Sequence, residues 1–151
     1  PWDEREFEMY TPDMKSPYRD RRAAFGKARY SALGIEREDW EARQRAAIAN
    51  WDCFGATAAL FCYIDRGLDR AQWADLGMYL QTVMLLLRAE GLDSCPQMAW
   101  SQVRETVADV LSPPDDGMLF CGMSIGYEDP EVPYIRTGRA PLDETVTFVD
   151  G

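Results

Sequence analysis

The stretch from residue 69 to residue 90 constrains the fold more than any other part of this 151-residue chain. Six of its apolar residues recur at helical spacing: Trp73, Leu76, Leu80, Val83, Met84 and Leu87. Three more put apolar surface on the other sides: Met78, Leu85 and Leu86. This pattern predicts a long helix that is buried nearly all round, either at the centre of a domain or in a dimer interface. Asp75, Gln81 and Arg88 interrupt the stretch and argue against a membrane span.

Two short apolar runs predict buried strands on either side of this helix. "FGATAALFCYID" (54–65) is bounded by Gly55 and by "DRG" at 65–67, and "MLFCGMSIGY" (118–127) follows the "PPDDG" turn at 113–117. The alternating segment "ETVTFV" (144–149) predicts a final strand.

Three further segments predict helices, at 17–34, 37–51 and 101–112. Gly34 is a suitable stop for the first, and Ser101 is a suitable N-cap for the last. Residues 1–16 and 128–143 lack periodicity and predict irregular structure. The mixture of helices and strands indicates an α+β or α/β class, and the length indicates one domain.

Composition excludes several classes of function. The net charge of −10 argues against a surface for nucleic acid or for an anionic membrane. The chain has no histidine, which removes Ser-His-Asp and Cys-His triads and most zinc chemistry. Its four cysteines form no C-x-x-C pair, so we expect no metal site and a reducing, cytoplasmic location. No signal peptide is visible.

The segment "GLDSCPQMAW" (91–100) is an unusual connector between two predicted helices. Pro96 restricts its backbone, and Met98 and Trp100 make it apolar. Such a segment suits a flat ligand. Taken alone, it fits better as an ordinary helix–helix connector with a packed tryptophan.

The order of short motifs over roughly residues 17–150 resembles the FMN-dependent nitroreductase family. The matching pieces are Asp75-Leu76-Gly77, Leu80-Gln81, Leu85-Leu86-Leu87, Gly91-Leu92, Cys95-Pro96, Gly126-Tyr127 and Arg139-Ala140-Pro141-Leu142. "ANWDCFGATAALFCYID" (49–65) is similar to the family's segment leading into a core strand. The resemblance implies an α+β fold with a central sheet flanked by helices and a long buried central helix. It also implies a single domain over 1–151, with 17–51 as a helical, lid-like insertion.

The resemblance assigns flavin contacts to two segments. Pro96, Gln97, Met98 and Ala99 would face the flavin ring, with backbone N–H groups hydrogen-bonded to its N5 side. Arg136 and Arg139 would hold the FMN phosphate, a task that suits the planar guanidinium fork. The alternative is two solvent-facing arginines on an irregular tail.

Aromatic residues of the 17–51 segment are the candidates for acceptor binding. Tyr30 and Trp40, together with Tyr18 and Phe25, could stack on an aromatic substrate. For any one of them, packing between the two helices is the commoner role.

The implied activity is reduction of nitro, quinone or similar acceptors by NAD(P)H through FMN, in a homodimer. The flavin carries the chemistry, so no catalytic acid or base is expected among the side chains. Residues 1–16 lack the family's Arg-x-Ser-x-Arg segment and its Gln-Pro-Trp turn, so we expect the domain to be incomplete at the N-terminus. A truncated, non-catalytic relative that binds a ligand or a partner chain is the alternative, and an unrelated α+β domain is a third.

Overall fold

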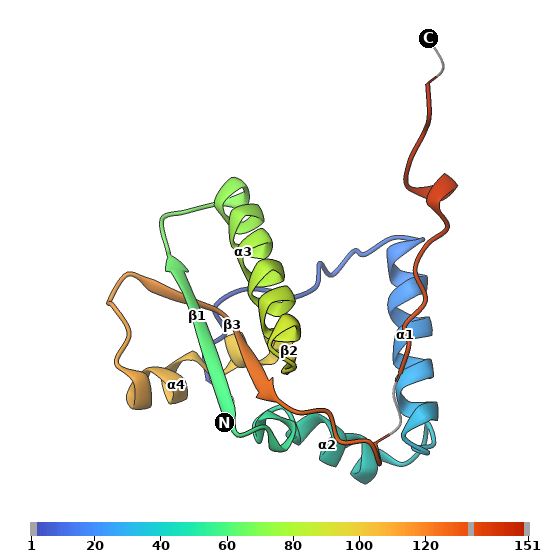
Figure 1. Cartoon of the computed structure of the whole chain (residues 1–151), viewed down its shortest axis with the longest axis horizontal. Helices are drawn as coiled ribbons and strands as arrows, with labels where there is room; N and C mark the ends of the chain where they lie inside the picture. The colour runs from blue at the N-terminus through green and yellow to red at the C-terminus, as the bar shows by residue number, and fades with distance from the viewer. Residues whose placement is uncertain (1–2, 133–134, 150–151) are drawn as a thin grey trace. The chain divides into compact units, whose positions relative to one another are not determined.

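A three-stranded antiparallel sheet in the order β1-β3-β2 forms the centre of the fold. The computed structural model describes residues 3–132 and 135–149, and Figure 1 shows the elements. β1 (Ala58–Asp65) and β3 (Gly117–Gly126) confirm the two predicted buried strands. β3 pairs with both neighbours and holds the most deeply buried side chains, among them Leu119, Cys121 and Met123.

The chain divides into two compact units. The first comprises Pro1–Thr11 and Gln44–Asp129 and contains the sheet. The second comprises Pro12–Arg43 and Pro130–Gly151.

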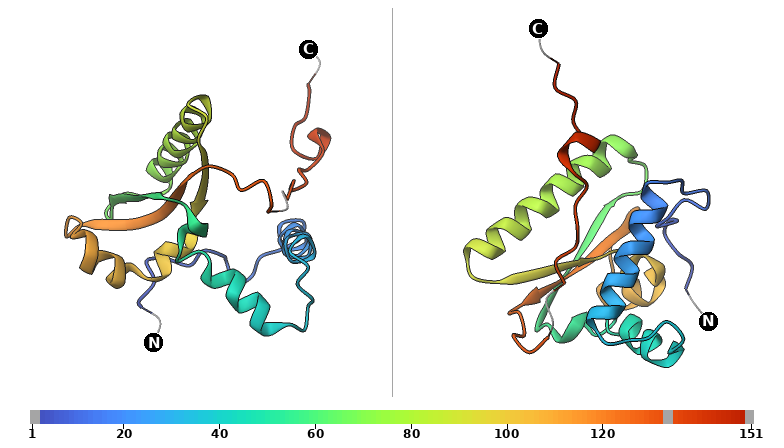
Figure 2. Two further views of the ribbon diagram at one scale, coloured as in Figure 1. Left: turned by 60° about the horizontal axis from the view of Figure 1, so that its bottom comes forward. Right: turned by 90° about the vertical axis from the view of Figure 1, so that its right-hand side faces the viewer.

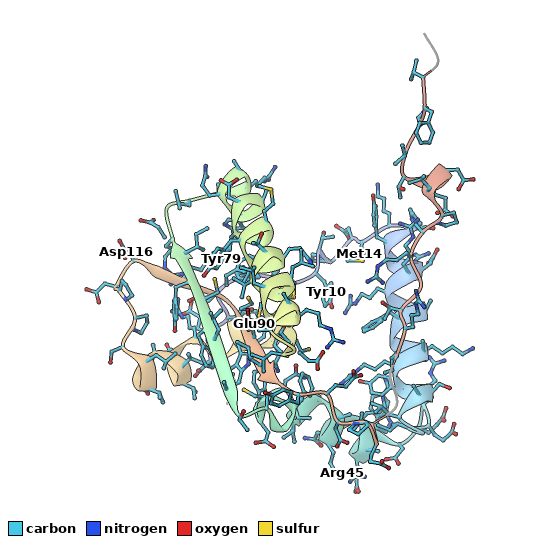
Figure 3. The ribbon with its side chains drawn as sticks, viewed as in Figure 1. Tyr10, Met14, Arg45, Tyr79, Glu90 and Asp116 are labelled. Atoms are coloured by element: carbon cyan, nitrogen blue, oxygen red, sulfur yellow. The ribbon has the colours of Figure 1, made fainter. Side chains whose placement is uncertain are left out.

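The long helix α3 (Arg70–Ala89) covers one face of the sheet and confirms the helix predicted at 69–90. Its core-facing side packs on Cys62, Cys121 and Met123 through Leu76, Leu80, Val83, Met84 and Leu87. The prediction that it is buried nearly all round is wrong within this chain, because the sheet covers only one side. Leu80 alone is fully buried, whereas Met78, Tyr79, Leu85 and Leu86 are 54–63% exposed. Figure 3 labels Tyr79 on this helix.

The opposite face of the sheet carries the helix α4 (Arg104–Leu111) and the short turns η1 (Cys53–Gly55) and η2 (Met98–Gln102). Figure 2 shows α3 and α4 on opposite sides of the sheet. Trp100 of η2 lies over Gly122 and makes edge contacts with Trp51 and Phe61, at centroid distances of 5.2 and 4.9 Å.

The N-terminal arm (residues 3–11) is irregular, as predicted, and several contacts hold it against the rest of the first unit. The Glu6 N–H donates to the Ser101 carbonyl (2.9 Å), and the Glu6 carboxylate accepts from Arg66 (2.6 Å) and from the Leu119 N–H (3.0 Å). The Phe7 ring packs on Trp73, at a centroid distance of 5.3 Å. The backbone N–H of Arg66 in turn donates to the carbonyl of Asp116, in the turn before β3.

Three local predictions are corrected by the structure. The expected connector at 91–100 contains a strand, β2 (Asp93–Gln97), which pairs with β3. The strand expected at 144–149 does not form, since its first residue closes the turn η3 (Leu142–Glu144) and residues 145–149 pair with no strand in the described part of the chain. Ser101 is not the N-cap of α4, because its hydroxyl is buried and donates to the Met98 carbonyl.

The second unit contains α1 (Tyr18–Ala32), and α2 (Trp40–Ile48) begins in it. These helices confirm the predictions at 17–34 and 37–51 with shorter bounds. Gly34, at φ +64°, follows the end of α1 in the left-handed conformation that glycine tolerates best. Arg21 of α1 pairs with Glu144 at 2.6 Å. In the described residues, every helix is too short or too polar to cross a bilayer.

Candidate functional site

The edge strand β2 presents backbone groups that the sheet does not use. Pro96 pairs with Met123, between the pairs Cys95–Ser124 and Gln97–Gly122. Proline has no N–H, so it is tolerated only where the strand's N–H would point away from its partner. Because backbone direction alternates along an antiparallel strand, the polar groups of Ser94 also point to this open edge.

Gln97 fixes the end of this strand through its side chain. The register places Gln97 opposite Gly122, on the same face as Ser124, and its side chain is only 3% exposed. Its Oε1 accepts from the Ser124 hydroxyl, and its Nε2 donates to the Asn50 carbonyl at 2.8 Å. The side chain is therefore committed to the fold and is not available to a ligand.

Met98 and Ala99 follow at the start of η2 and are half-buried. The first N–H groups of a helical turn have no acceptor within the turn. The next residue, Trp100, has a buried Nε1 without an acceptor among the described residues. Residues 96–99 thus combine a fixed backbone, spare N–H groups and apolar cover, which fits a planar ring with polar edge atoms.

Arg136 and Arg139 lie on the exposed C-terminal segment of the second unit. The Arg139 guanidinium folds back on its own backbone, with Nη1 donating to the carbonyls of Thr137 (3.1 Å) and Gly138 (3.3 Å). Within the described residues neither arginine has a carboxylate partner within 4.0 Å. Both charges remain available to a phosphate.

Tyr30 and Trp40 are brought together by Arg43, a residue that the sequence analysis did not single out. The Arg43 guanidinium carbon lies 3.8 Å from the centroid of Tyr30 and 5.8 Å from that of Trp40. Tyr30 and Arg43 line a cavity of about 790 Å³ within the second unit, whereas Trp40 is 75% exposed. The i, i+3 spacing of Trp40 and Arg43 on one helix was the available signal.

The buried titratable groups are structural. Burial alone would raise the pKa of Glu6, but the Arg66 guanidinium and the Leu119 amide hold it below its ordinary value. Burial raises the pKa of Cys121 to about 12, with a smaller effect from Cys62. A thiol with such a pKa is not a nucleophile at neutral pH. In residues 3–132 and 135–149, no cluster of three or more His, Cys, Asp or Glu side chains is suited to hold a metal ion.

Comparison with known proteins identifies the family to which a chain with these features belongs. The model of the nitroreductase family matches residues 17–127. The chain is 37% identical to the 4-nitrobenzoate reductase of Pseudomonas putida over 136 residues, which cover 90% of this chain and 60% of that protein. It is 33% identical to the nitrobenzene nitroreductase of Ectopseudomonas oleovorans over 146 residues, which cover 95% and 64%.

Solved structures of nitroreductases superimpose on this chain as well. The FMN and NADPH-dependent nitroreductase NfnB from Sphigopyxis sp. strain HMH superimposes with a TM-score of 0.94 at 38% identity, covering 99% of this chain and 68% of that one. The FMN-dependent NfnB from Mycobacterium smegmatis, solved in complex with NADPH, gives 0.91 at 31% identity, covering 96% and 66%. These neighbours confirm the predicted α+β fold.

The chain spans 60 to 64% of the length of the two curated relatives described above. Over that span, the family match takes in both buried strands, the long helix α3 and the edge strand β2 with its Pro96 turn. The chain belongs to the nitroreductase family.

Proposed function

We propose that this protein is an FMN-dependent oxidoreductase that uses NAD(P)H to reduce nitro, quinone or similar acceptors. The observation that carries the proposal is the backbone edge at residues 96–99, held rigid by the bonds of Gln97 to Ser124 and Asn50. Its relatives are named for the reduction of nitroarenes, and two of its structural neighbours are named for FMN.

Bound FMN would supply hydride and electron transfer between NAD(P)H and the acceptor. The residues of this chain would position it. Pro96, Met98 and Ala99, with the backbone of Gln97, would lie against the ring, where spare N–H groups can donate to its polar edge. Arg136 and Arg139 would hold the phosphate through charge-assisted hydrogen bonds.

The 17–51 segment would bind the acceptor, with Tyr30 and Trp40 as the aromatic contacts. Arg43 already orders the Tyr30 ring, since the two groups stack at 3.8 Å. No acid or base is assigned to a side chain, in keeping with a chain that has no histidine. The rate of reduction would depend on how the protein places the acceptor against the flavin and on how well it excludes water.

We further propose that two copies associate through the exposed side of α3 and that the protein works in the reducing cytoplasm. Leu85 and Leu86 are 61% and 63% exposed on that helix, next to Met78 and Tyr79, which is more apolar surface than a solvated helix usually shows. In the described part of the chain none of the four cysteines is in a disulfide, including the cross-strand neighbours Cys62 and Cys121.

Titration of FMN against the protein tests the cofactor assignment. Arg139→Ala should weaken FMN binding about tenfold, the value of one charge-assisted phosphate contact. Arg19→Ala is the matched control, because Arg19 is exposed and pairs with its neighbour Asp20. Equal FMN affinity in wild type and Arg139→Ala would remove Arg139 from the site. Failure of the wild type to bind FMN would favour the non-catalytic alternative.

A further inference from the structure

The turn η1 holds three successive residues in the left-handed backbone conformation. Their φ angles are +47° at Cys53, +54° at Phe54 and +77° at Gly55. Glycine adopts this conformation readily, whereas a bulky side chain such as that of phenylalanine meets steric resistance in it. Other parts of the fold must therefore hold Phe54 in this conformation, and residues held in this way gather at functional sites.

Backbone hydrogen bonds fix the turn on both sides of Phe54. The Cys53 N–H donates to the Asn50 carbonyl at 3.2 Å, and the Phe54 N–H donates to the Ala49 carbonyl at 2.9 Å. On the other side, the Ala56 N–H donates to the Cys53 carbonyl at 3.0 Å. The direction in which the Phe54 side chain leaves the backbone is therefore set by the turn.

The turn is also bonded to the end of β2 through one shared acceptor. The Asn50 carbonyl that accepts from the Cys53 N–H also accepts from Nε2 of Gln97, at 2.8 Å. Both segments belong to the first unit, within Gln44–Asp129, so their relative placement is part of one compact body. The turn therefore lies next to the backbone edge at residues 96–99.

Phe54 presents its ring to solvent rather than to the core. The residue is 45% exposed and makes no ring contact with another aromatic side chain of the described residues. Its neighbour Trp51, by contrast, packs edge-on against Trp100. The surface beside the ring is open, because a Cβ built on Gly55 meets nothing within 4 Å. A ring that a strained backbone holds beside an open surface indicates a ligand contact.

We propose that Phe54 is a further cofactor-contact residue, whose ring packs against the flavin ring of FMN beside residues 96–99. The inference rests on the proposed FMN-dependent function and adds a side-chain contact to an edge that otherwise offers backbone groups. Aromatic rings attract each other beyond the area that they bury, so one such contact strengthens the binding of a planar cofactor. The strained conformation at position 54 is the cost of presenting the ring.

Titration of FMN and of riboflavin against the protein tests this contact without any need for turnover. Phe54→Gly should weaken FMN binding about tenfold, as the loss of one aromatic contact predicts. Riboflavin has the same ring without the phosphate, so its affinity should fall by the same factor. Phe54→Tyr should keep the wild-type affinity because the ring remains. Phe54→Leu keeps apolar bulk without a flat ring, and it should weaken FMN binding about threefold.

Thermal melting without FMN separates a ligand contact from a structural role. Glycine relieves the strain at position 54 and adds freedom to the unfolded chain, so Phe54→Gly should melt within about 2 °C of wild type. A large fall in melting temperature would make Phe54 a structural residue and overturn the inference. Tyr10→Gly is the matched control, because Tyr10 is an aromatic residue of the same unit and is 47% exposed. Its FMN affinity should equal that of wild type.

The outcomes separate this inference from the proposed function. Unchanged FMN affinity in Phe54→Gly, or equal affinities in the Leu and Tyr variants, would overturn the inference and leave the proposed function standing. Unchanged FMN affinity with a raised KM for nitrobenzene would assign the ring to the acceptor and overturn the inference as well. FMN binding that depends on Phe54, in a protein whose flavin neither NADH nor NADPH reduces, would support the contact and contradict the proposed function. A wild type that binds no FMN would overturn both.

Discussion

At the scale of single residues, the packing beneath the proposed flavin-binding edge depends on the absence of a side chain at position 122. Gly122 lies opposite Gln97 in the sheet, and a Cβ built on it would overlap the Trp100 indole. Trp100 also contacts Trp51 and Phe61, so it has little freedom to move aside. Glycine at 122 is therefore required by the indole above it.

Gly122→Ala should lower the free energy of unfolding by about 2 kcal/mol, as overpacking of a filled core does. The matched control is Gly77→Ala in α3, where an added Cβ meets nothing within 4 Å. That change should raise stability by roughly 0.5–1 kcal/mol through helix propensity. Urea unfolding measures the stability of both variants. Equal changes in the free energy of unfolding would contradict the close packing of Trp100 on Gly122.

Glu6 predicts a dependence of stability on pH. Its folded pKa lies below the ordinary value of 4.5, so it stabilises the fold above that pH, and this contribution is lost as pH falls through the folded pKa. Glu6→Gln should cost about 1–3 kcal/mol at pH 7, because the nearly buried carboxylate loses its bonds to Arg66 and Leu119. The gap to wild type should narrow below pH 4.5.

Thermal melts of wild type and Glu6→Gln from pH 7 to pH 3 measure this gap. Glu8→Gln is the control, since Glu8 is 64% exposed and pairs only with Arg5 in the described structure. A gap that stays constant over the whole range would show that the ionised form of Glu6 does not matter.

At the scale of elements, the start of α4 is capped from a distant part of the chain. The Thr106 N–H donates to the carboxylate of Asp3 at 2.8 Å, across 103 positions of sequence. This bond replaces the local cap that Ser101 would have supplied. The hydrogen bonds that Asp3 makes with Thr106 lower the pKa of the Asp3 carboxyl. The N-terminal arm therefore stabilises a helix that follows the β2 strand.

Asp3→Ala should speed hydrogen exchange at the Thr106 amide and at the first turn of α4, because the cap is lost. Amides in α3 should exchange as in wild type. Asp13→Ala, in the exposed part of the arm region, is the control. Unchanged protection of Thr106 in Asp3→Ala would rule out the cap.

The strongly periodic elements could be predicted from the sequence, and those set by distant partners could not. The apolar spacing of 69–90 and the continuous runs of β1 and β3 reflect burial against each other. β2 has the sequence "DSCPQ", with a proline and no apolar alternation, and it is a strand because β3 offers it an edge. "ETVTFV" alternates well but has no partner strand in the described residues, so propensity alone did not make it one.

Some parts of the candidate site could be predicted from the sequence, and others could not. Residues 96–99 and the two C-terminal arginines followed from the order of family motifs, and their roles stay predictions. Arg43 was missed as the partner of Tyr30 and Trp40, because its place beside the Tyr30 ring depends on the turn between α1 and α2. A single sequence shows a cation in a helix but not which distant ring it stacks on.

At the scale of the whole molecule, the exposed side of α3 predicts self-association. Leu86→Glu should shift the protein toward monomer, because a carboxylate in an apolar interface is costly to bury. Val110→Glu is the control, since Val110 is 79% exposed on α4. Size-exclusion chromatography with light scattering measures the mass. A wild type that is monomeric at all concentrations would contradict this interface.

The most direct test of the central claim is the visible absorption spectrum of the purified protein after incubation with FMN and removal of the free cofactor. The account predicts retained oxidised-flavin bands that bleach with NADPH or NADH under anaerobic conditions and return when a nitroarene is added. A protein that stays colourless, or whose bound flavin is not reduced by either nucleotide, would contradict it.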